Sequence, residues 1–177
     1  MISTSLTNPT QSSETPDLVD DLAGLQPETP LQAVRAARAD VARYAQGSYL
    51  ALLEPADPAG VSRVERELIA LRVAVLTASA VLAAHHRGRL REHGVAAEHI
   101  AAVEHFPTAG GLAARETAIL RHVDRLTQEP RAADEGDIQA LQAAGLGARD
   151  IVTIAQLIAF LSFQVRLLAG LRVLAET

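Results

Sequence analysis

The sequence predicts an all-α protein, a bundle of several helices that assembles into an oligomer. Three observations favour this fold class. Apolar residues make up 49% of the 177 residues and aromatic residues only 3%, and a composition dominated by Ala and Leu favours helix over strand. Apolar side chains recur at helical spacing in most segments. The final apolar run, residues 151–165, carries no charge, and with the other apolar helices it offers more apolar surface than a small monomer usually buries.

Charge and cysteine content exclude several function classes. The net charge is −5, and Arg residues alternate with acids, so no nucleic-acid partner is expected. The chain has no cysteine, which excludes disulfides, thiolate metal sites and thiol catalysis. The apolar run at 151–165 is shorter than the roughly 20 residues of a membrane span. With no signal-peptide pattern after Met1, we expect a cytoplasmic protein without a membrane partner.

Proline and turn residues divide the first third of the chain. Residues 1–16 are rich in Ser and Thr, which predicts a disordered N-terminal arm. Residues 17–177 are predicted to form a single domain, long enough to bury a sizeable core. A short helix is expected at residues 17–25 and one longer helix at residues 31–53, which Pro55 and Pro58 bring to an end.

The stretch from residue 62 to residue 94 carries the polar side chains that are candidates for catalysis. Ser62 followed by Glu65 is typical of a capping box, so a helix is expected from there to about residue 76. A break at 77–79 precedes a second helix that ends near Gly94. If the two helices form a hairpin, Glu67 on the first approaches His86 on the second.

The sequence after Gly94 predicts four further helices, near residues 97–104, 112–128, 134–144 and 148–175. Pro and Gly residues separate them, as expected for helix ends. The last helix is apolar on nearly all sides, which predicts burial inside the bundle and in a subunit contact.

The pattern ERELIALRVAVLTAS, followed by the His85–His86 pair, resembles the alkylhydroperoxidase D and carboxymuconolactone decarboxylase family over about residues 31–174. The resemblance implies an all-helical bundle that forms a homotrimer or a hexamer. The redox members of that family use two cysteines of a Cys-x-x-Cys-x-x-x-His run, with a Glu and the His as a proton relay. By this resemblance Glu67 matches the relay Glu and His86 the relay His, while Ser79 and Leu82 stand at the two cysteine positions.

A second register is also open, with His85 at the histidine position and Ala78 and Val81 at the cysteine positions. The first register keeps the family's Glu spacing and is preferred. Both registers lack the attacking and resolving thiols that peroxide reduction requires. We therefore expect that the chain is not a thiol peroxidase.

Two hypotheses for function remain. In the first, Glu67, His86 and Ser79 are the candidate catalytic residues, and the Glu–His pair performs acid–base chemistry on a small carbonyl compound. Ser79 lies about 10 Å along the helix axis from His86, too far for a direct activating hydrogen bond. In the second hypothesis the pair is structural, and the chain is a non-catalytic binding or structural member of the family.

Leu82, His85 and Arg72 are the candidate pocket residues. Arg72 is expected to pair with Glu67 or another acid, or else to bind a substrate carboxylate. Adjacent helical residues point about 100° apart, so His85 and His86 are not expected to share a metal ion. We expect no cofactor and no metal, and a small molecule as the ligand. The other histidines, at positions 93, 99, 105 and 122, are expected to be solvated.

Overall fold

The structure is a computed structural model that describes residues 17–26 and 29–175. Within these residues all regular structure is helical, which confirms the predicted all-α class. The predicted arm, residues 1–16, lies outside the described residues. The elements are α1 (Leu18–Ala23), α2 (Pro30–Ala36), α3 (Ala39–Leu53), α4 (Arg63–Leu76), α5 (Ala80–Glu92), α6 (Ala97–Glu104), α7 (Ala114–Gln128), the 3₁₀ helix η1 (Pro130–Ala132), α8 (Glu135–Ala143) and α9 (Ala148–Ala175).

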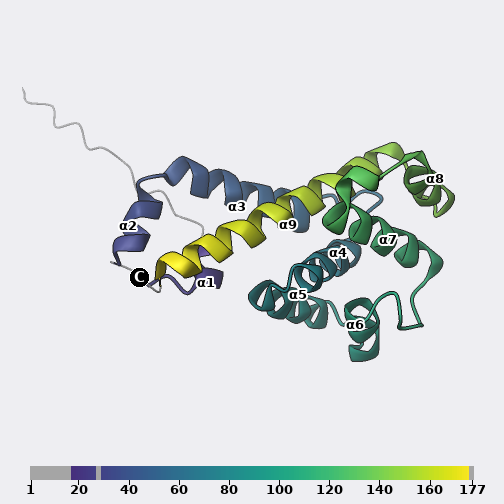
Figure 1. Cartoon of the computed structure of the whole chain (residues 1–177), viewed down its shortest axis with the longest axis horizontal. Coiled ribbons are helices and arrows are strands. Elements are labelled where there is room, and N and C mark those ends of the chain that lie inside the picture. Colours follow the sequence, from purple (N-terminus) through teal and green to yellow (C-terminus); the bar gives the residue numbers. More distant parts are fainter. Residues whose placement is uncertain (1–16, 27–28, 176–177) are drawn as a thin grey trace, which may run out of the picture.

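Helix α4 is the centre of the bundle. It packs against α5, α6, α7 and α9, and each of its residues from 66 to 74 is buried. Figure 1 shows α9 as the long helix that crosses the molecule, with α3 beside it and the α4–α5 hairpin near its middle. The hairpin therefore holds its polar side chains between buried surfaces.

Helix α9 supplies the longest apolar surface. It is long and apolar enough to cross a membrane by length and composition alone, and 44% of its most apolar window is buried within the bundle. Its buried side chains enter both apolar clusters of the core, for example Ile154 in one and Leu168 in the other. The face that carries these side chains packs in the core, as predicted for the bundle, whereas the rest of the helix, including Val152 and Phe163, is not buried within the chain.

The prediction of one helix across residues 31–53 is wrong, because the chain breaks between α2 and α3. At the break Arg38 has φ −119° and ψ 46°, outside the helical region. No Gly or Pro marks the position. Arg35, on the last turn of α2, forms ion pairs with Asp17, the N-cap of α1, and with Asp20 within α1. These contacts hold α2 against α1, so tertiary contacts override the local helix propensity.

Candidate functional site

Helices α4 and α5 form the hairpin on which the expected approach of Glu67 to His86 depended. The Ser62 hydroxyl accepts a hydrogen bond from the Glu65 amide, and the Glu65 carboxylate accepts one from the Ser62 amide, which confirms the capping box. Between the helices, Ala78 adopts a left-handed conformation with φ 52°. Gly94, with φ 75°, follows α5. The tight turn folds α5 back along α4 and brings their polar side chains together.

Glu67 and His86 meet inside this hairpin. The Nδ1 atom of His86 lies 2.7 Å from Oε2 of Glu67, and both residues are 0% exposed. Because a carboxylate accepts and does not donate, Nδ1 carries the hydrogen, and in the neutral form of the ring Nε2 then keeps a lone pair. Within the described chain, His86 Nε2 and Glu67 Oε1 have no hydrogen-bond partner. The site thus contains a buried imidazole that is oriented by a carboxylate and has an unsatisfied basic nitrogen.

Arg89, one turn after His86, places a positive charge beside the pair. Its Nε lies 3.6 Å from Glu67 Oε1, while Nη2 and Nη1 bond to Glu54 and Glu92 at 2.8 Å and 2.9 Å. Arg89 was not among the residues predicted for the site. Its spacing of three from His86 put it on the same helix stripe and could have indicated it.

His85 points to a different partner from that of His86. Its Nε2 lies 3.1 Å from the hydroxyl of Tyr49 on α3, and its ring meets the His86 ring edge-on at a centroid distance of 4.9 Å. Burial, with the neighbouring His86, lowers the pKa of His85 to about 4, so His85 is neutral at neutral pH and shares a hydrogen bond with the Tyr49 hydroxyl. Burial, with the nearby Glu67 and Glu54 carboxylates, raises the pKa of Tyr49, so its hydroxyl stays protonated.

The two predicted cysteine positions have different surroundings. Ser79 is the N-cap of α5, and its side chain makes no capping bond. No hydrogen bond in the described chain joins Ser79 to His86, whose side-chain partner is Glu67. Leu82 is 1% exposed and belongs to an apolar cluster that includes Leu168 of α9. In the preferred register, apolar packing therefore surrounds the residue expected at the second cysteine position.

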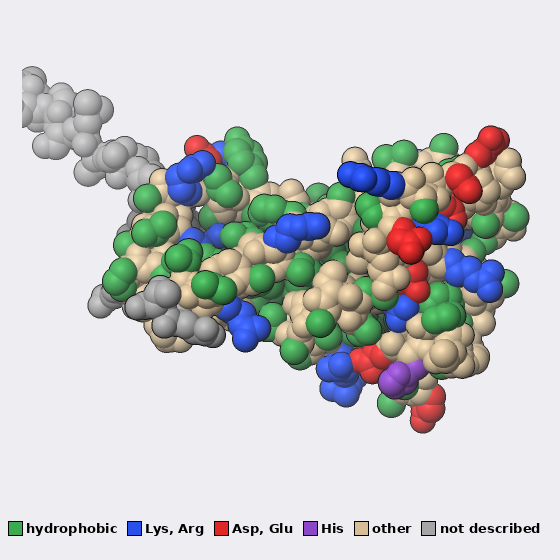
Figure 2. All heavy atoms as spheres, in the orientation of Figure 1, with side chains coloured by type: hydrophobic (Ala, Val, Ile, Leu, Met, Phe, Trp, Pro, Cys, Tyr) green, Lys and Arg blue, Asp and Glu red, His purple; other side chains and the backbone are tan. Residues whose placement is uncertain are grey.

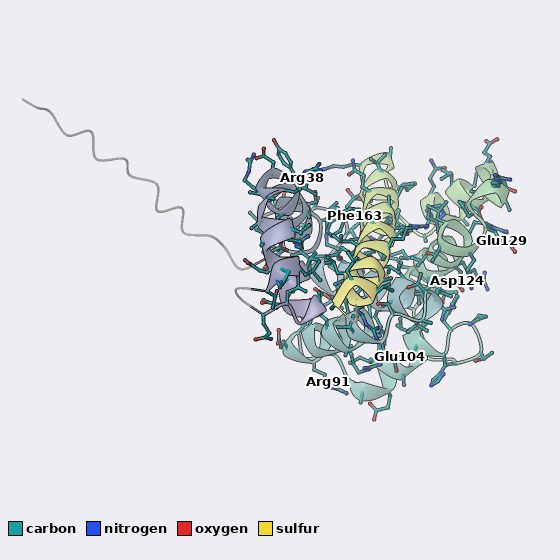
Figure 3. The ribbon with its side chains drawn as sticks, turned by 60° about the vertical axis from the view of Figure 1, so that its left-hand side comes forward. Arg38, Arg91, Glu104, Asp124, Glu129 and Phe163 are labelled. Atoms are coloured by element: carbon teal, nitrogen blue, oxygen red, sulfur yellow. The ribbon has the colours of Figure 1, made fainter. Side chains whose placement is uncertain are left out.

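Arg72 pairs with an acid other than Glu67. Its Nε and Nη2 bond to the two carboxylate oxygens of Asp124 on α7, at 2.6 Å and 2.7 Å, and Nη1 reaches the Glu104 carbonyl. Figure 3 labels Asp124 and Glu104 on α7 and α6. The structural interpretation of Arg72 fits this bidentate geometry, because all three nitrogens already face protein oxygens.

A separate cleft of about 520 Å³ lies near that ion pair. Residues of α7, of α8 and of the Phe106–Pro107 turn line it, among them Asp124 and Glu129, which Figure 3 labels. None of the predicted site residues lines this cleft. Its lining carries both signs of charge, with two arginines and three acids.

One of the remaining histidines contradicts the expectation of solvation. His122 is 4% exposed, and burial lowers its pKa. It follows Ile119 by three positions and precedes Val123, both of which are buried, so helical periodicity places it on the inner face of α7. His99 is half-buried and lies 2.9 Å from a Glu116 oxygen. In the described part of the chain no group of three or more His, Cys, Asp or Glu could hold a metal ion.

Fold and site together define an all-helical protein with a buried carboxylate–imidazole pair between the two helices of a hairpin. The model of the carboxymuconolactone decarboxylase family matches residues 32–125, more than half of the chain. The chain therefore belongs to the carboxymuconolactone decarboxylase family, as the resemblance implied.

Several solved structures share the fold. An uncharacterized peroxidase-related protein from Silicibacter sp. TM1040 matches 75% of this chain and 68% of its own, with 20% identity and a TM-score of 0.69. An uncharacterized peroxidase-related protein from Ralstonia eutropha JMP134, described as an alkylhydroperoxidase AhpD core, matches 86% of this chain and 78% of its own, with 22% identity and a TM-score of 0.70. A protein of unknown function from Agrobacterium tumefaciens matches 85% of this chain and 92% of its own, with 23% identity and a TM-score of 0.62. No curated protein matches the chain.

Proposed function

We propose that the chain catalyses proton transfer on a small carbonyl compound, with His86 as the base and Glu67 as its positioning partner. The observation that carries this proposal is the Nε2 atom of His86, which is buried and has no hydrogen-bond partner in the described chain. Buried polar atoms are normally satisfied. An unsatisfied nitrogen on an otherwise fixed ring is what a general base needs before its substrate arrives.

The chemistry follows from the hydrogen bond on the opposite side of the ring. His86 Nε2 takes a proton from the carbon next to a carbonyl group, the C–H bond breaks, and its electron pair forms an enolate. The Glu67 carboxylate, 2.7 Å from Nδ1, stabilises the imidazolium that results. Return of the proton to carbon restores the neutral ring. A positioned base of this kind contributes about 10²–10⁴-fold to the rate.

Sulfur chemistry is not part of the proposal, because the chain has no cysteine. Neither Ser79 nor Leu82 provides a thiolate that could attack a peroxide, and no second sulfur is present to resolve a sulfenic acid. In the proposed role, Glu67 and His86 transfer protons without the two cysteines that the family's peroxidases use.

The test is exchange of ketone α-protons into D₂O, followed by ¹H NMR with an uncharged methyl ketone. We expect the wild type to accelerate exchange over buffer, and H86A to lose the acceleration. E67Q should lose about 10²-fold or more, because a neutral amide stabilises the imidazolium less well. Circular dichroism is the control for folding. Equal exchange by wild type and H86A, both folded, would contradict the proposal.

A non-catalytic role is the second candidate. It is favoured by the complete burial of both members of the pair, since a buried Glu and His also tie α4 to α5 when no substrate exists. The same assay separates the two candidates. A wild type that never exceeds the buffer rate with any uncharged ketone in the panel, and shows no thermal shift with them, supports the structural role.

We also propose that copies of the chain associate, as a homotrimer or a hexamer. The support is a set of exposed large apolar side chains on α2, α3 and α9, where Figure 2 shows hydrophobic surface. Tyr44 is 64% exposed and Phe163 is 41% exposed. A cytoplasmic location, and the lack of membrane and nucleic-acid partners, stay predictions of the sequence.

A further inference from the structure

The guanidinium group of Arg89, which lies beside the proposed base, already has carboxylate neighbours within the chain. Each of the three nitrogens of Arg89 faces a carboxylate oxygen, from Glu54 at 2.8 Å, Glu92 at 2.9 Å and Glu67 at 3.6 Å. These contacts come from three elements: the C-terminal end of α3, α4 and α5 itself. A substrate carboxylate that approached Nη1 or Nη2 would have to displace Glu92 or Glu54, and one that approached Nε, which is buried without a hydrogen-bond partner in the described chain, would compete with the Glu67 carboxylate.

The charges around this guanidinium do not cancel. Three carboxylates, from Glu54, Glu67 and Glu92, share the single positive charge of Arg89. With neutral histidines the cluster therefore carries a net charge of −2. Within the described chain no other Lys or Arg lies in ion-pair distance of Glu67. The two buried arginines of α4 are committed elsewhere. Arg66 donates to three backbone carbonyls, and Arg72 donates to the Asp124 carboxylate and the Glu104 carbonyl.

From this arrangement we propose that the site accepts uncharged carbonyl compounds and rejects those that carry a carboxylate. The inference rests on the proposed function, because it concerns the ligand of the same base. An anion near the 0%-exposed Glu67–His86 pair would lose its hydration without gaining a cation, and would meet like charge. An uncharged ketone needs neither a counter-ion nor a displaced acid, so it avoids both costs.

The test compares a ketone acid with its own ester. In 4-oxopentanoate and methyl 4-oxopentanoate the methyl-ketone protons have nearly the same chemistry, and only the remote charge differs. With the full chain at pH 7.5, we expect exchange of the ester into D₂O to be at least tenfold faster than exchange of the acid. The rate of H86A is subtracted for each compound, and the spectra also report whether the ester stays intact.

A charge variant makes the argument specific to Arg89. E54Q/E92Q removes two competing carboxylates and should raise the acid-to-ester ratio at least tenfold, because Arg89 can then bind the substrate carboxylate. E98Q/E135Q is the matched control, since it removes the same charge from exposed positions on α6 and α8. It should leave the ratio within about twofold, as screening between distant exposed charges predicts.

The outcomes separate this inference from the proposed function. Equal exchange of acid and ester, or the same change of the acid-to-ester ratio in both double variants, would overturn the inference. Neither result would contradict the proposed role of His86 as the base. If the protein exchanges neither compound, the proposed function fails, and ligand-observed NMR binding decides the inference. Binding of the ester alone would support it, whereas binding of the acid, or of neither compound, would overturn it.

Discussion

H86L should lower the free energy of unfolding by about 3–5 kcal/mol. The substitution keeps a similar volume but leaves the Glu67 carboxylate 0% exposed, with Arg89 Nε at 3.6 Å as its remaining ion-pair partner in the described chain. A buried charge that loses its hydrogen-bond partner is among the costliest single changes in a protein. For a domain of this size the melting temperature should fall by roughly 10 °C, and urea unfolding followed by circular dichroism measures both quantities.

The double variant E67M/H86L is the matched control. It replaces both members with apolar side chains, and buried ion pairs replaced in this way are often neutral or stabilising. It should therefore recover most of the stability that H86L loses. The coupling energy of the cycle built with E67M, H86L and the double variant should be a few kcal/mol. A cost below about 1 kcal/mol for H86L, or no recovery in the double variant, would contradict the buried hydrogen bond.

R66M should cost about 3 kcal/mol, because Arg66 holds the connection between α3 and α4. Arg66 is 4% exposed, and Nε, Nη1 and Nη2 donate to the carbonyls of Val61, Leu52 and Pro58 at 2.8, 2.6 and 2.9 Å. Met keeps the apolar stem but leaves three carbonyl oxygens without their charged donor. Burial lowers the pKa of Arg66, which reflects the cost that these three bonds offset. Urea unfolding measures the loss.

Arg63 offers the control on the same helix. It is exposed and donates one hydrogen bond, to the Pro55 carbonyl at 2.8 Å, so R63M should cost less than about 1 kcal/mol. R66K should recover only part of the loss, because an ammonium group cannot reproduce the planar guanidinium fork. Similar losses in R63M and R66M would show that the three carbonyl contacts contribute little.

The hairpin and its Glu67–His86 pair were predictable because they depend on local patterns. The Ser62 capping signal fixes where α4 begins, and the break before Ala80 fixes where α5 begins. Helical periodicity then sets which side chains of each helix face the other. A tight turn forces two consecutive helices to pack as neighbours, so no long-range information was needed to bring residues 67 and 86 together.

Contacts between distant helices were not predictable in the same way. Asp124, the partner of Arg72, is 52 residues away in sequence, and the pattern of α4 does not say which helix lies above its C-terminal half. The break between α2 and α3 depends on the ion pairs of Arg35 with α1, and no Gly or Pro in the sequence marks its position. Such features are decided by tertiary packing, which overrides local propensity.

The site was predictable in part for the same reason. Arg89 shares a stripe with His86, so local periodicity could have found it, as it could have placed His122 on the inner face of α7. The bond from Tyr49 to His85 joins residues 36 positions apart and requires knowledge of where α3 lies. The charges that decide which ligand fits come partly from α3, through Glu54, and are invisible until the helices are assembled.

The most direct test of the account is the protonation of the His86 ring, measured by ¹⁵N NMR of labelled protein at pH 7.5 and assigned with H86Q. The account predicts a hydrogen on Nδ1, bonded to Glu67, and an unprotonated Nε2 whose signal shifts when methyl 4-oxopentanoate is added. A hydrogen on Nε2, or an Nε2 signal that no uncharged ketone changes, would contradict the claim that this buried nitrogen is a working base.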